Sequence, residues 1–286
     1  MVLKHYLGVL YNLKKYLNLS ISSKNNCVTV INYHGIEPEF FKNFEFQINW
    51  LNRNYKIITP NEFKAYVNGD IEFSEHCILI TFDDGFISSY DSIQKVLNPL
   101  EIKILFFIPS IFLNHTNKKF EEIISKNFFS GRLNVEKFPD CYRPIDNLKI
   151  KILIKQGHMI GGHTHSHCDV TKINSNELIK KEIVQPINIY KKLFDIKLNS
   201  FAFPYGRINH INNYLLKKIT LNYAYCFSNI RGTNSKETSN FAIKRQNVSP
   251  DMPINYFGFI IEGGLDFYWK FHSNKLNLMA KNIFKK

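Results

Sequence analysis

Two adjacent carboxylates and a short run of alternating histidines are the residues of this chain whose types and spacing could do chemistry. Asp83 and Asp84 directly follow an apolar stretch and precede a glycine, and His163, His165 and His167 lie within five residues. Neighbouring side chains on an extended strand point to opposite sides, so the two carboxylates should have different roles. Two carboxylates at one strand end also repel each other, and a bound cation is the simplest remedy.

Carboxylate and imidazole together suit zinc, or a similar divalent ion such as cobalt or nickel. On a strand the alternating histidines share one face, and on a helical turn His163 and His167 still converge. With Asp84 they form a set of three ligands, which leaves a position open for catalysis. Two simpler interpretations stay open: Asp84 and Gly85 as an ordinary turn, and the histidines as a surface cluster.

Three sequence motifs resemble those of the polysaccharide deacetylase family, the NodB-homology domain of carbohydrate esterase family 4. They are Thr-Phe-Asp-Asp-Gly (81–85), His-Thr-His-Ser-His (163–167) and Phe-Ala-Phe-Pro-Tyr-Gly (201–206), in the family's order and with roughly its spacing. The resemblance covers approximately residues 28–248. It implies a single α/β domain with a distorted (β/α)7-type barrel. It also implies a divalent metal held by Asp84, His163 and His167, and hydrolysis of acetyl groups on sugars.

His34 is expected to be the general acid. It follows the apolar stretch 28–33 in a Tyr-His pair that is similar to one in deacetylases of the poly-N-acetylglucosamine type, where that histidine takes the place of a C-terminal Leu-x-His motif. This chain lacks such a motif, since its late histidine, His272, follows no matching strand. A polar residue at the edge of the core is the simpler reading of His34.

The third motif departs from the family's commoner version, which begins with an arginine that orients the catalytic aspartate. Phe201 occupies that position here. Arg245 could supply the missing guanidinium to Asp83, although a surface salt bridge would explain it equally well. The resemblance implies that Tyr205 provides a backbone N–H to the oxyanion.

The expected reaction is therefore metal-dependent removal of N-acetyl groups from amino sugars of a cell-surface polysaccharide or its lipid-linked precursor. Asp83 would act as the base, His34 would protonate the departing amine, and the ion would lower the pKa of water to about 7 from about 15.7. Three alternatives stay open: an O-acetyl esterase, a deformylase of lipid-linked sugars, and a non-catalytic glycan-binding module.

Composition narrows the partners and the compartment. The chain has 286 residues, enough for one full core, and its five cysteines include no CxxC pair, which favours a reducing compartment. The formal net charge is +13, but the lysines are spread along the chain and no nucleic-acid motif appears. An anionic glycan, or peripheral contact with an anionic membrane, suits this charge better than nucleic acid does. The oligomeric state has no readable signal.

Three segments are expected. Residues 1–26 are predicted to form a basic amphipathic helix that caps the domain or anchors it to a membrane. Residues 27–250 are expected to form the deacetylase-like domain, and residues 251–286 an aromatic and basic extension of it. No clear signal peptide appears, so we expect a cytoplasmic location or one at the inner face of the membrane. The aromatic run 267–269 is expected to pack against the domain. Residues 115–143 predict an irregular excursion that shapes specificity.

The elements that position these residues are predicted from apolar runs and helix signals. Strands are expected at 28–33, 78–82, 102–108 and 198–203, each ending near a motif or a polar residue. Helices are expected at 44–52, 61–68, 91–97, 148–156 and 176–194, the second beginning at Pro60-Asn61 with an N-cap candidate, Asn61. Pro186, in the middle of the last helix, predicts a kink.

Overall fold

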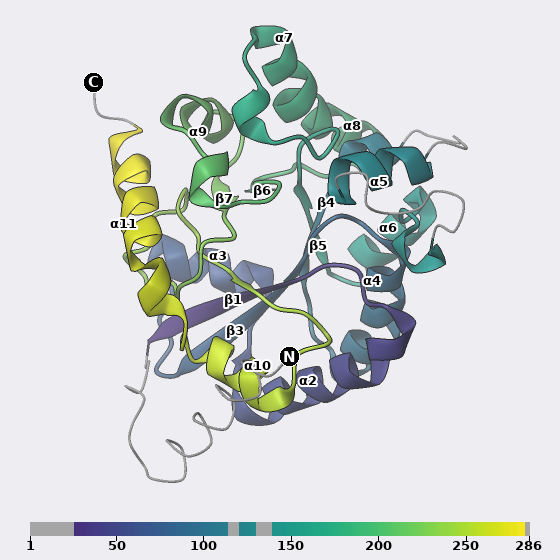
Figure 1. Cartoon of the computed structure of the whole chain (residues 1–286), viewed down its shortest axis with the longest axis vertical. Coiled ribbons are helices and arrows are strands. Elements are labelled where there is room, and N and C mark those ends of the chain that lie inside the picture. Colours follow the sequence, from purple (N-terminus) through teal and green to yellow (C-terminus); the bar gives the residue numbers. More distant parts are fainter. Residues whose placement is uncertain (1–25, 114–119, 130–138, 284–286) are drawn as a thin grey trace.

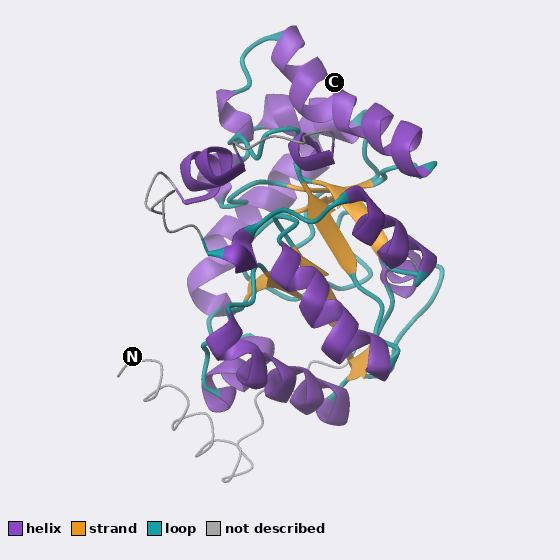
Figure 2. Cartoon of the chain, turned by 90° about the vertical axis from the view of Figure 1, so that its right-hand side faces the viewer, coloured by secondary structure: helices purple, strands orange, loops and turns teal. Residues whose placement is uncertain are grey.

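The computed structural model describes residues 26–113, 120–129 and 139–283. Residues 1–25 of the expected amphipathic helix and parts of the excursion over 115–143 lie outside these residues. The described part of that excursion is not irregular as predicted, since it contains the α-helix Phe120–Phe129. The described part is an α/β fold in which helices surround a parallel sheet, and Figures 1 and 2 show the strands enclosed by helices.

The sheet is an arc of parallel strands in the order β7-β6-β5-β4-β3-β1-β8, and β2 pairs with β3 outside this path. The strands are β1 (Cys27–Tyr33), β2 (Lys56–Ile57), β3 (His76–Phe82), β4 (Leu105–Ile108), β5 (Met159–Gly162), β6 (Ser200–Ala202), β7 (Tyr225–Phe227) and β8 (Gln246–Asn247). An isolated parallel bridge between Phe227 and Ile243 brings β7 toward the segment that leads into β8. Because β8 also pairs with β1, the arc curls toward closure, which confirms the predicted distorted barrel.

Strand β1 lies inside the sheet, between β3 and β8, and every one of its residues is buried. Its register with β3 aligns Tyr33 with Phe82, so both strands end at the same level. His34 and Asp83 follow these two residues directly. Parallel pairing therefore brings two of the candidate residues to one edge of the sheet, where (β/α) barrels carry their functional groups.

The helices cover the outer face of the sheet. They are α2 (Phe41–Asn54), α3 (Pro60–Asn68), α4 (Ile87–Ser92), α5 (Phe120–Phe129), α6 (Asn147–Lys155), α7 (Asn176–Ile179), α8 (Gln185–Phe194), α9 (Asn213–Thr220), α10 (Ile254–Ile261) and α11 (Asp266–Asn282). The main hydrophobic core extends from β1 to α10 and α11, so the C-terminal helices share the core of the barrel. Among the described residues, no helix has the length and apolar character needed to cross a membrane.

Three local predictions need correction. Helix α3 is capped by Thr59, which forms a reciprocal capping box with Glu62, and not by Asn61. The segment 91–97 is not one α-helix, since α4 ends at Ser92 and a π-helical turn, Ile93–Leu97, follows. The strand predicted over 102–108 pairs only from Leu105 onward.

The long helix predicted over 176–194 is continuous but changes its hydrogen-bond register. A π-helical turn, Lys180–Val184, joins α7 to α8 immediately before Pro186. Proline lacks an N–H and clashes with the carbonyl four residues earlier, which here belongs to Glu182. A wider turn is one way for a helix to absorb that conflict, and such turns often occur at functional sites.

The expectation that the aromatic run 267–269 packs against the domain is wrong for two of its three residues. Phe267 and Tyr268 are 80% and 74% exposed, as is Phe271 at 74%. Only Trp269 packs against the main core. The run lies in the first turns of α11, so its residues point in different directions around the helix.

Candidate metal and hydrolase site

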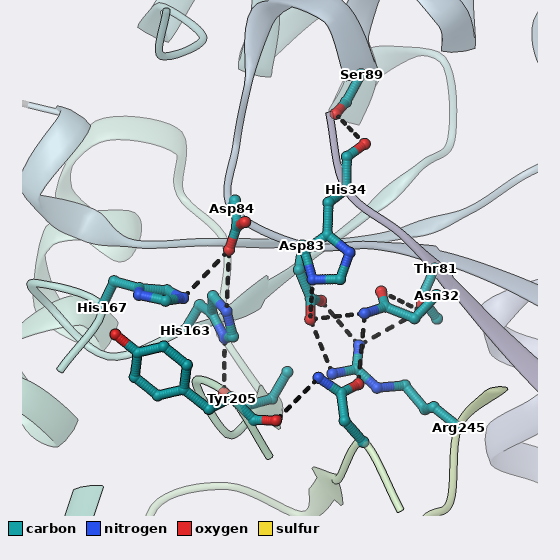
Figure 3. A network of polar contacts seen from close by, with 12 residues as sticks. Asn32, His34, Thr81, Asp83, Asp84, Ser89, His163, His167, Tyr205 and Arg245 are labelled. Atoms are coloured by element: carbon teal, nitrogen blue, oxygen red, sulfur yellow. Dashed lines mark hydrogen bonds and ion pairs between the residues drawn. The ribbon is translucent and has the colours of Figure 1, made fainter. Parts of the chain in front are cut away.

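The candidate residues come from separate strand ends and meet in one cavity of about 560 Å³. His34 follows β1, Asp83 and Asp84 follow β3, His163 follows β5, and Tyr205 lies beyond β6. Figure 3 shows His163 and His167 directed at Asp84, and the guanidinium of Arg245 directed at Asp83. The structure thus brings all seven candidate site residues together, six of them in the lining of the cavity and Arg245 behind Asp83.

Asp84 and two histidines form a group that could hold a metal ion. Nε2 of His163 lies 3.5 Å from Asp84 Oδ1, and Nε2 of His167 lies 3.3 Å from the same oxygen. The three potential ligand atoms lie within 4.8 Å of one another, and all three residues are buried. His165, the histidine between them, instead contacts the Ser110 hydroxyl through its Nδ1.

The hydrogen bonds of the two histidines fit them for a cation. Nδ1 of His163 lies 2.8 Å from the carbonyl oxygen of Ala202, and Nδ1 of His167 lies 3.1 Å from that of Asn127. A carbonyl can only accept, so each Nδ1 carries a proton, and Nε2, on the side of Asp84, is the ring atom left to bind an ion. Asp84 Oδ1 is buried without a hydrogen-bond partner among the described residues. This donor set therefore suits a zinc-like ion.

The pKa of Asp84 reflects the same arrangement. Burial alone would raise it, but the two imidazoles lower it, and the net pKa lies well below its usual value. The carboxylate is thus available as an anionic ligand.

The turn that carries the histidines is fastened by a buried carboxylate. Glu182 Oε2 accepts hydrogen bonds from the backbone N–H groups of His165 and Ser166, at 3.1 and 2.9 Å. Thr164 also steadies the turn, since its hydroxyl accepts a hydrogen bond from the Cys168 N–H. Glu182 belongs to the π-helical turn, so the irregular helix has a direct contact with the metal-ligand segment. No motif in the sequence points to Glu182.

Close packing also holds the strand ends. Phe128 stacks on His167 with ring centroids 4.0 Å apart. A Cβ added at Gly161 would lie 2.4 Å from the Phe107 ring, and one at Gly85 would lie 2.6 Å from Ile108 Cγ2. Gly161, in the pair of glycines before His163, therefore permits a close approach.

Asp83 is almost fully buried, and its carboxylate accepts hydrogen bonds from two residues. Arg245 donates from Nη1 to Oδ1 and from Nη2 to Oδ2, both at 2.8 Å. Asn32 donates to Oδ2 at 2.9 Å, a contact that no sequence motif predicts. Burial raises the pKa of Asp83, but the guanidinium and the neighbouring imidazoles outweigh it, so the net pKa lies below its usual value.

Arg245 is completely buried, so the surface salt bridge is the wrong interpretation of this residue. Its Nε donates to the Ser228 carbonyl at 2.9 Å, and its guanidinium lies 5.3 Å from the centre of the Phe107 ring. These contacts orient the two Nη atoms of Arg245 toward Asp83. The guanidinium comes from the β7 and β8 side of the sheet and not from the position of Phe201.

His34 and Tyr205 lie on opposite sides of the carboxylates. Nε2 of His34 is 4.0 Å from Asp83 Oδ2, too far for a direct hydrogen bond, and the side chain is 35% exposed. Tyr205 has a left-handed backbone with φ of 61°, and its N–H has no acceptor among the described residues. Asp84, Thr164 and His167 also have positive φ. Backbone strain of this kind gathers at functional sites.

Comparison with known proteins identifies a family. The model of the family described as polysaccharide deacetylase matches residues 70–224. YxkH of Bacillus subtilis is 25% identical over 77% of this chain and 69% of its own length. The poly-β-1,6-N-acetyl-D-glucosamine N-deacetylase of Staphylococcus aureus is 24% identical over 71% of this chain and 72% of its own length.

Solved structures share the fold. IcaB from Ammonifex degensii superimposes with a TM-score of 0.62 at 19% identity, and the alignment covers 83% of this chain and 98% of that one. At this level of identity the likeness shows the arrangement of the backbone alone.

Proposed function

Because the chain belongs to the polysaccharide deacetylase family, we propose that it is a metal-dependent hydrolase that removes N-acetyl groups from the amino sugars of a glycan. The observation that carries this proposal is the pairing of two differently equipped carboxylates. Asp84 has a buried oxygen without a hydrogen-bond partner, close to Nε2 of two histidines, while Asp83 is held by an arginine and an amide.

We assign the metal-ligand role to Asp84, His163 and His167. A divalent ion bound there supplies a Lewis acid that polarises an acetyl carbonyl and acidifies water. The hydrogen bonds at Nδ1 of both histidines turn each Nε2 toward Asp84, as this task requires. Zinc suits the donor set best, and cobalt and nickel are also compatible with it.

The remaining residues handle protons and charge. Asp83, ionised at neutral pH because its pKa lies below the usual value, accepts the proton of the attacking water. His34 Nε2 donates a proton to the departing amine, which leaves poorly without one. The backbone N–H of Tyr205 donates to the developing oxyanion, and Arg245 keeps Asp83 in position.

The test is product analysis by mass spectrometry on N-acetylglucosamine oligomers, with chelated protein before and after addition of zinc, cobalt or nickel. We expect a loss of acetyl that depends on the added metal. Asp83→Asn should retain metal and lose turnover by about 10²–10⁴-fold, the usual contribution of a general base. His163→Ala should lose metal as well.

His165→Ala is the matched control, because His165 belongs to the same histidine run but contacts Ser110 and not Asp84. It should retain both metal and turnover. Full activity of chelated protein, or of Asp83→Asn, would contradict the mechanism. Parallel assays on N-acetyl, O-acetyl and N-formyl versions of one sugar separate the deacetylase from an esterase or deformylase, and absence of any turnover in metal-loaded protein would favour a glycan-binding module.

A further inference from the structure

Two arginines that the proposed mechanism does not use line the same cavity as the candidate metal ligands. They are Arg207, which is exposed, and Arg231, which is partly buried. Arg207 follows the third motif, and Arg231 lies beyond the part of the chain that the family model matches. Cationic side chains in the lining of a substrate cavity bear on which substrate can enter it.

The loops that carry these arginines are hydrogen-bonded to each other. The Asn229 N–H donates to the Gly206 carbonyl at 2.8 Å, and the Asn229 side chain donates to the Tyr205 carbonyl at 3.3 Å. Asn32 connects this pair of loops to the proposed base, since its amide contacts Asn229 Oδ1 at 3.4 Å and Asp83 Oδ2 at 2.9 Å. Both arginines therefore project from loops beside the reacting centre.

Arg231 is held in place by neutral oxygen atoms. Its Nη1 donates to Gln246 Oε1 at 2.8 Å, and its Nη2 donates to the Asn247 carbonyl at 3.0 Å. Gln246 is itself oriented by Asp266, at the start of α11, through a hydrogen bond of 2.6 Å. Burial lowers the pKa of Arg231, and the nearby Tyr256 and Asp266 offset this effect only in part.

The carboxylates of the cavity do not neutralise these arginines. Asp83 forms its ion pair with Arg245, and Asp84 faces the two imidazoles. The ion pairs found among the described residues include neither Arg207 nor Arg231. The cavity therefore keeps two guanidinium groups for an anion supplied from outside.

We propose that the substrate glycan carries an anionic group, a carboxylate or a phosphate, close to the N-acetyl sugar, and that Arg207 and Arg231 bind this group. Guanidinium groups match the planar oxygen pairs of carboxylate and phosphate and give two parallel hydrogen bonds. Trp269 lines the same cavity one helical turn after Asp266 and offers its ring to the sugar face. This inference rests on the proposed function, whose substrate class it narrows.

The test compares two tetrasaccharides and a sugar phosphate. Chitotetraose is neutral, a tetrasaccharide of alternating N-acetylglucosamine and glucuronic acid carries carboxylates, and N-acetylglucosamine 1-phosphate carries a phosphate. Binding is measured by calorimetry on metal-loaded Asp83→Asn protein, and kcat/KM for acetyl release is measured on the active chain. At least one anionic probe should bind tenfold or more tightly than chitotetraose, and the tighter of the two identifies the anionic group.

Arg207→Gln and Arg231→Gln should each reduce the preference for the anionic probe over the neutral one by at least tenfold. Arg53→Gln, an equal change of charge at an exposed position near the end of α2, should leave that preference unaltered. Arg207 is exposed, so its variant tests the inference even if Arg231→Gln does not fold. Equal binding of charged and neutral probes, or equal losses for both in the variants, would overturn the inference.

These outcomes separate the two proposals. Arginine-dependent binding of an anionic probe without acetyl release from any probe would refute the hydrolase and leave the anion site in place. Metal-dependent acetyl release with no preference for charge would support the hydrolase and refute the anion site.

Discussion

At the scale of single residues, Asp83 is a buried charge for whose lost hydration its neighbours must compensate. A carboxylate that is 1% exposed loses nearly all its hydration, and Arg245 and Asn32 supply the compensating donors. Arg245 is equally buried, so neither partner can turn to solvent if the other is removed. The pair should therefore determine both stability and the state of the proposed base.

Replacing Arg245 by methionine should destabilise the chain by about 3–5 kcal/mol, because it leaves a buried charge without its partner. Turnover should also fall, since Asp83 loses two donors. The measurement is urea unfolding with parallel acetyl-release assays. Adding Asp83→Asn to Arg245→Met should recover part of the stability and none of the activity. Arg53→Met, on the surface, should change the free energy of unfolding by no more than about 0.5 kcal/mol; an equally small effect at Arg245 would contradict this account.

The sequence predicts the residues of the site better than it predicts the residues that hold them in place through hydrogen bonds. Asp84, His163 and His167 are recognisable because each follows an apolar run in a motif of fixed spacing. Asn32 and Glu182 are not, since one lies inside a buried strand and the other inside a helix, and only the tertiary fold brings them to Asp83 and to the histidine turn. The sequence suggests Arg245 as the partner of Asp83 only because Phe201 stands where the family's commoner motif has an arginine.

At the scale of elements, the strand ends were predictable and the irregular turns were not. Apolar runs in the sequence indicate buried strands. The choice between Thr59 and Asn61 as the helix cap depends instead on whether the Glu62 side chain can accept a hydrogen bond from the backbone N–H of the cap residue. Pro186 signals a disturbance in its helix but not the form that it takes. The π-helical turn depends on packing that places Glu182 against the loop of the histidines.

The entry to β5 contains a buried histidine that should make stability depend on pH. The N–H of Ile104 donates to His158 Nδ1 at 3.2 Å, and Nε2 lies 2.9 Å from Asn98 Oδ1, so the ring is neutral and joins the starts of β4 and β5. Burial lowers the pKa of His158 to about 4, with a contribution from Lys103. The unfolded chain binds this proton near pH 6.5 and the folded chain only near pH 4.

Stability contributed by the neutral ring should therefore be lost as pH falls from about 6.5 to 4, by up to about 3 kcal/mol. His158→Gln removes this titration. The free energy of unfolding of the unmodified protein should therefore fall by that amount relative to that of the variant over the same pH interval. Urea unfolding at several pH values between 4 and 7.5 measures the difference, and the value at pH 7.5 reports the lost contacts alone. Parallel curves would show that His158 does not titrate differently on folding.

At the scale of the whole molecule, the C-terminal helices belong to the same core as the barrel. Phe257 in α10 is fully buried and contacts Trp50 of α2 with ring centroids 5.9 Å apart. Phe267, ten residues later, is 80% exposed. The sequence shows two aromatic-rich stretches of similar character. They differ in whether a given side chain lies on the side of its helix that contacts the core or on the side that faces solvent.

Two phenylalanine substitutions test this arrangement. Phe257→Ala should destabilise the chain by about 3–5 kcal/mol, the usual cost of a large cavity in a core. Phe267→Ala, the same chemical change on the exposed side of α11, should alter stability by no more than about 0.5 kcal/mol. Thermal or urea unfolding compares them directly. Comparable effects for the two variants would mean that α10 is not part of the common core.

The pairing of β1 with both β3 and β8 has a consequence for how the molecule is made. The ribosome releases β1 early, yet one of its neighbours, together with the arginine that faces Asp83, emerges more than 200 residues later. A growing chain can form the sheet from β1 to β7 while that edge is still open and the aspartate still lacks its partner. The site should therefore become complete late in synthesis, in a single step, when the segment around residues 245–247 pairs with β1 and brings Arg245 to Asp83.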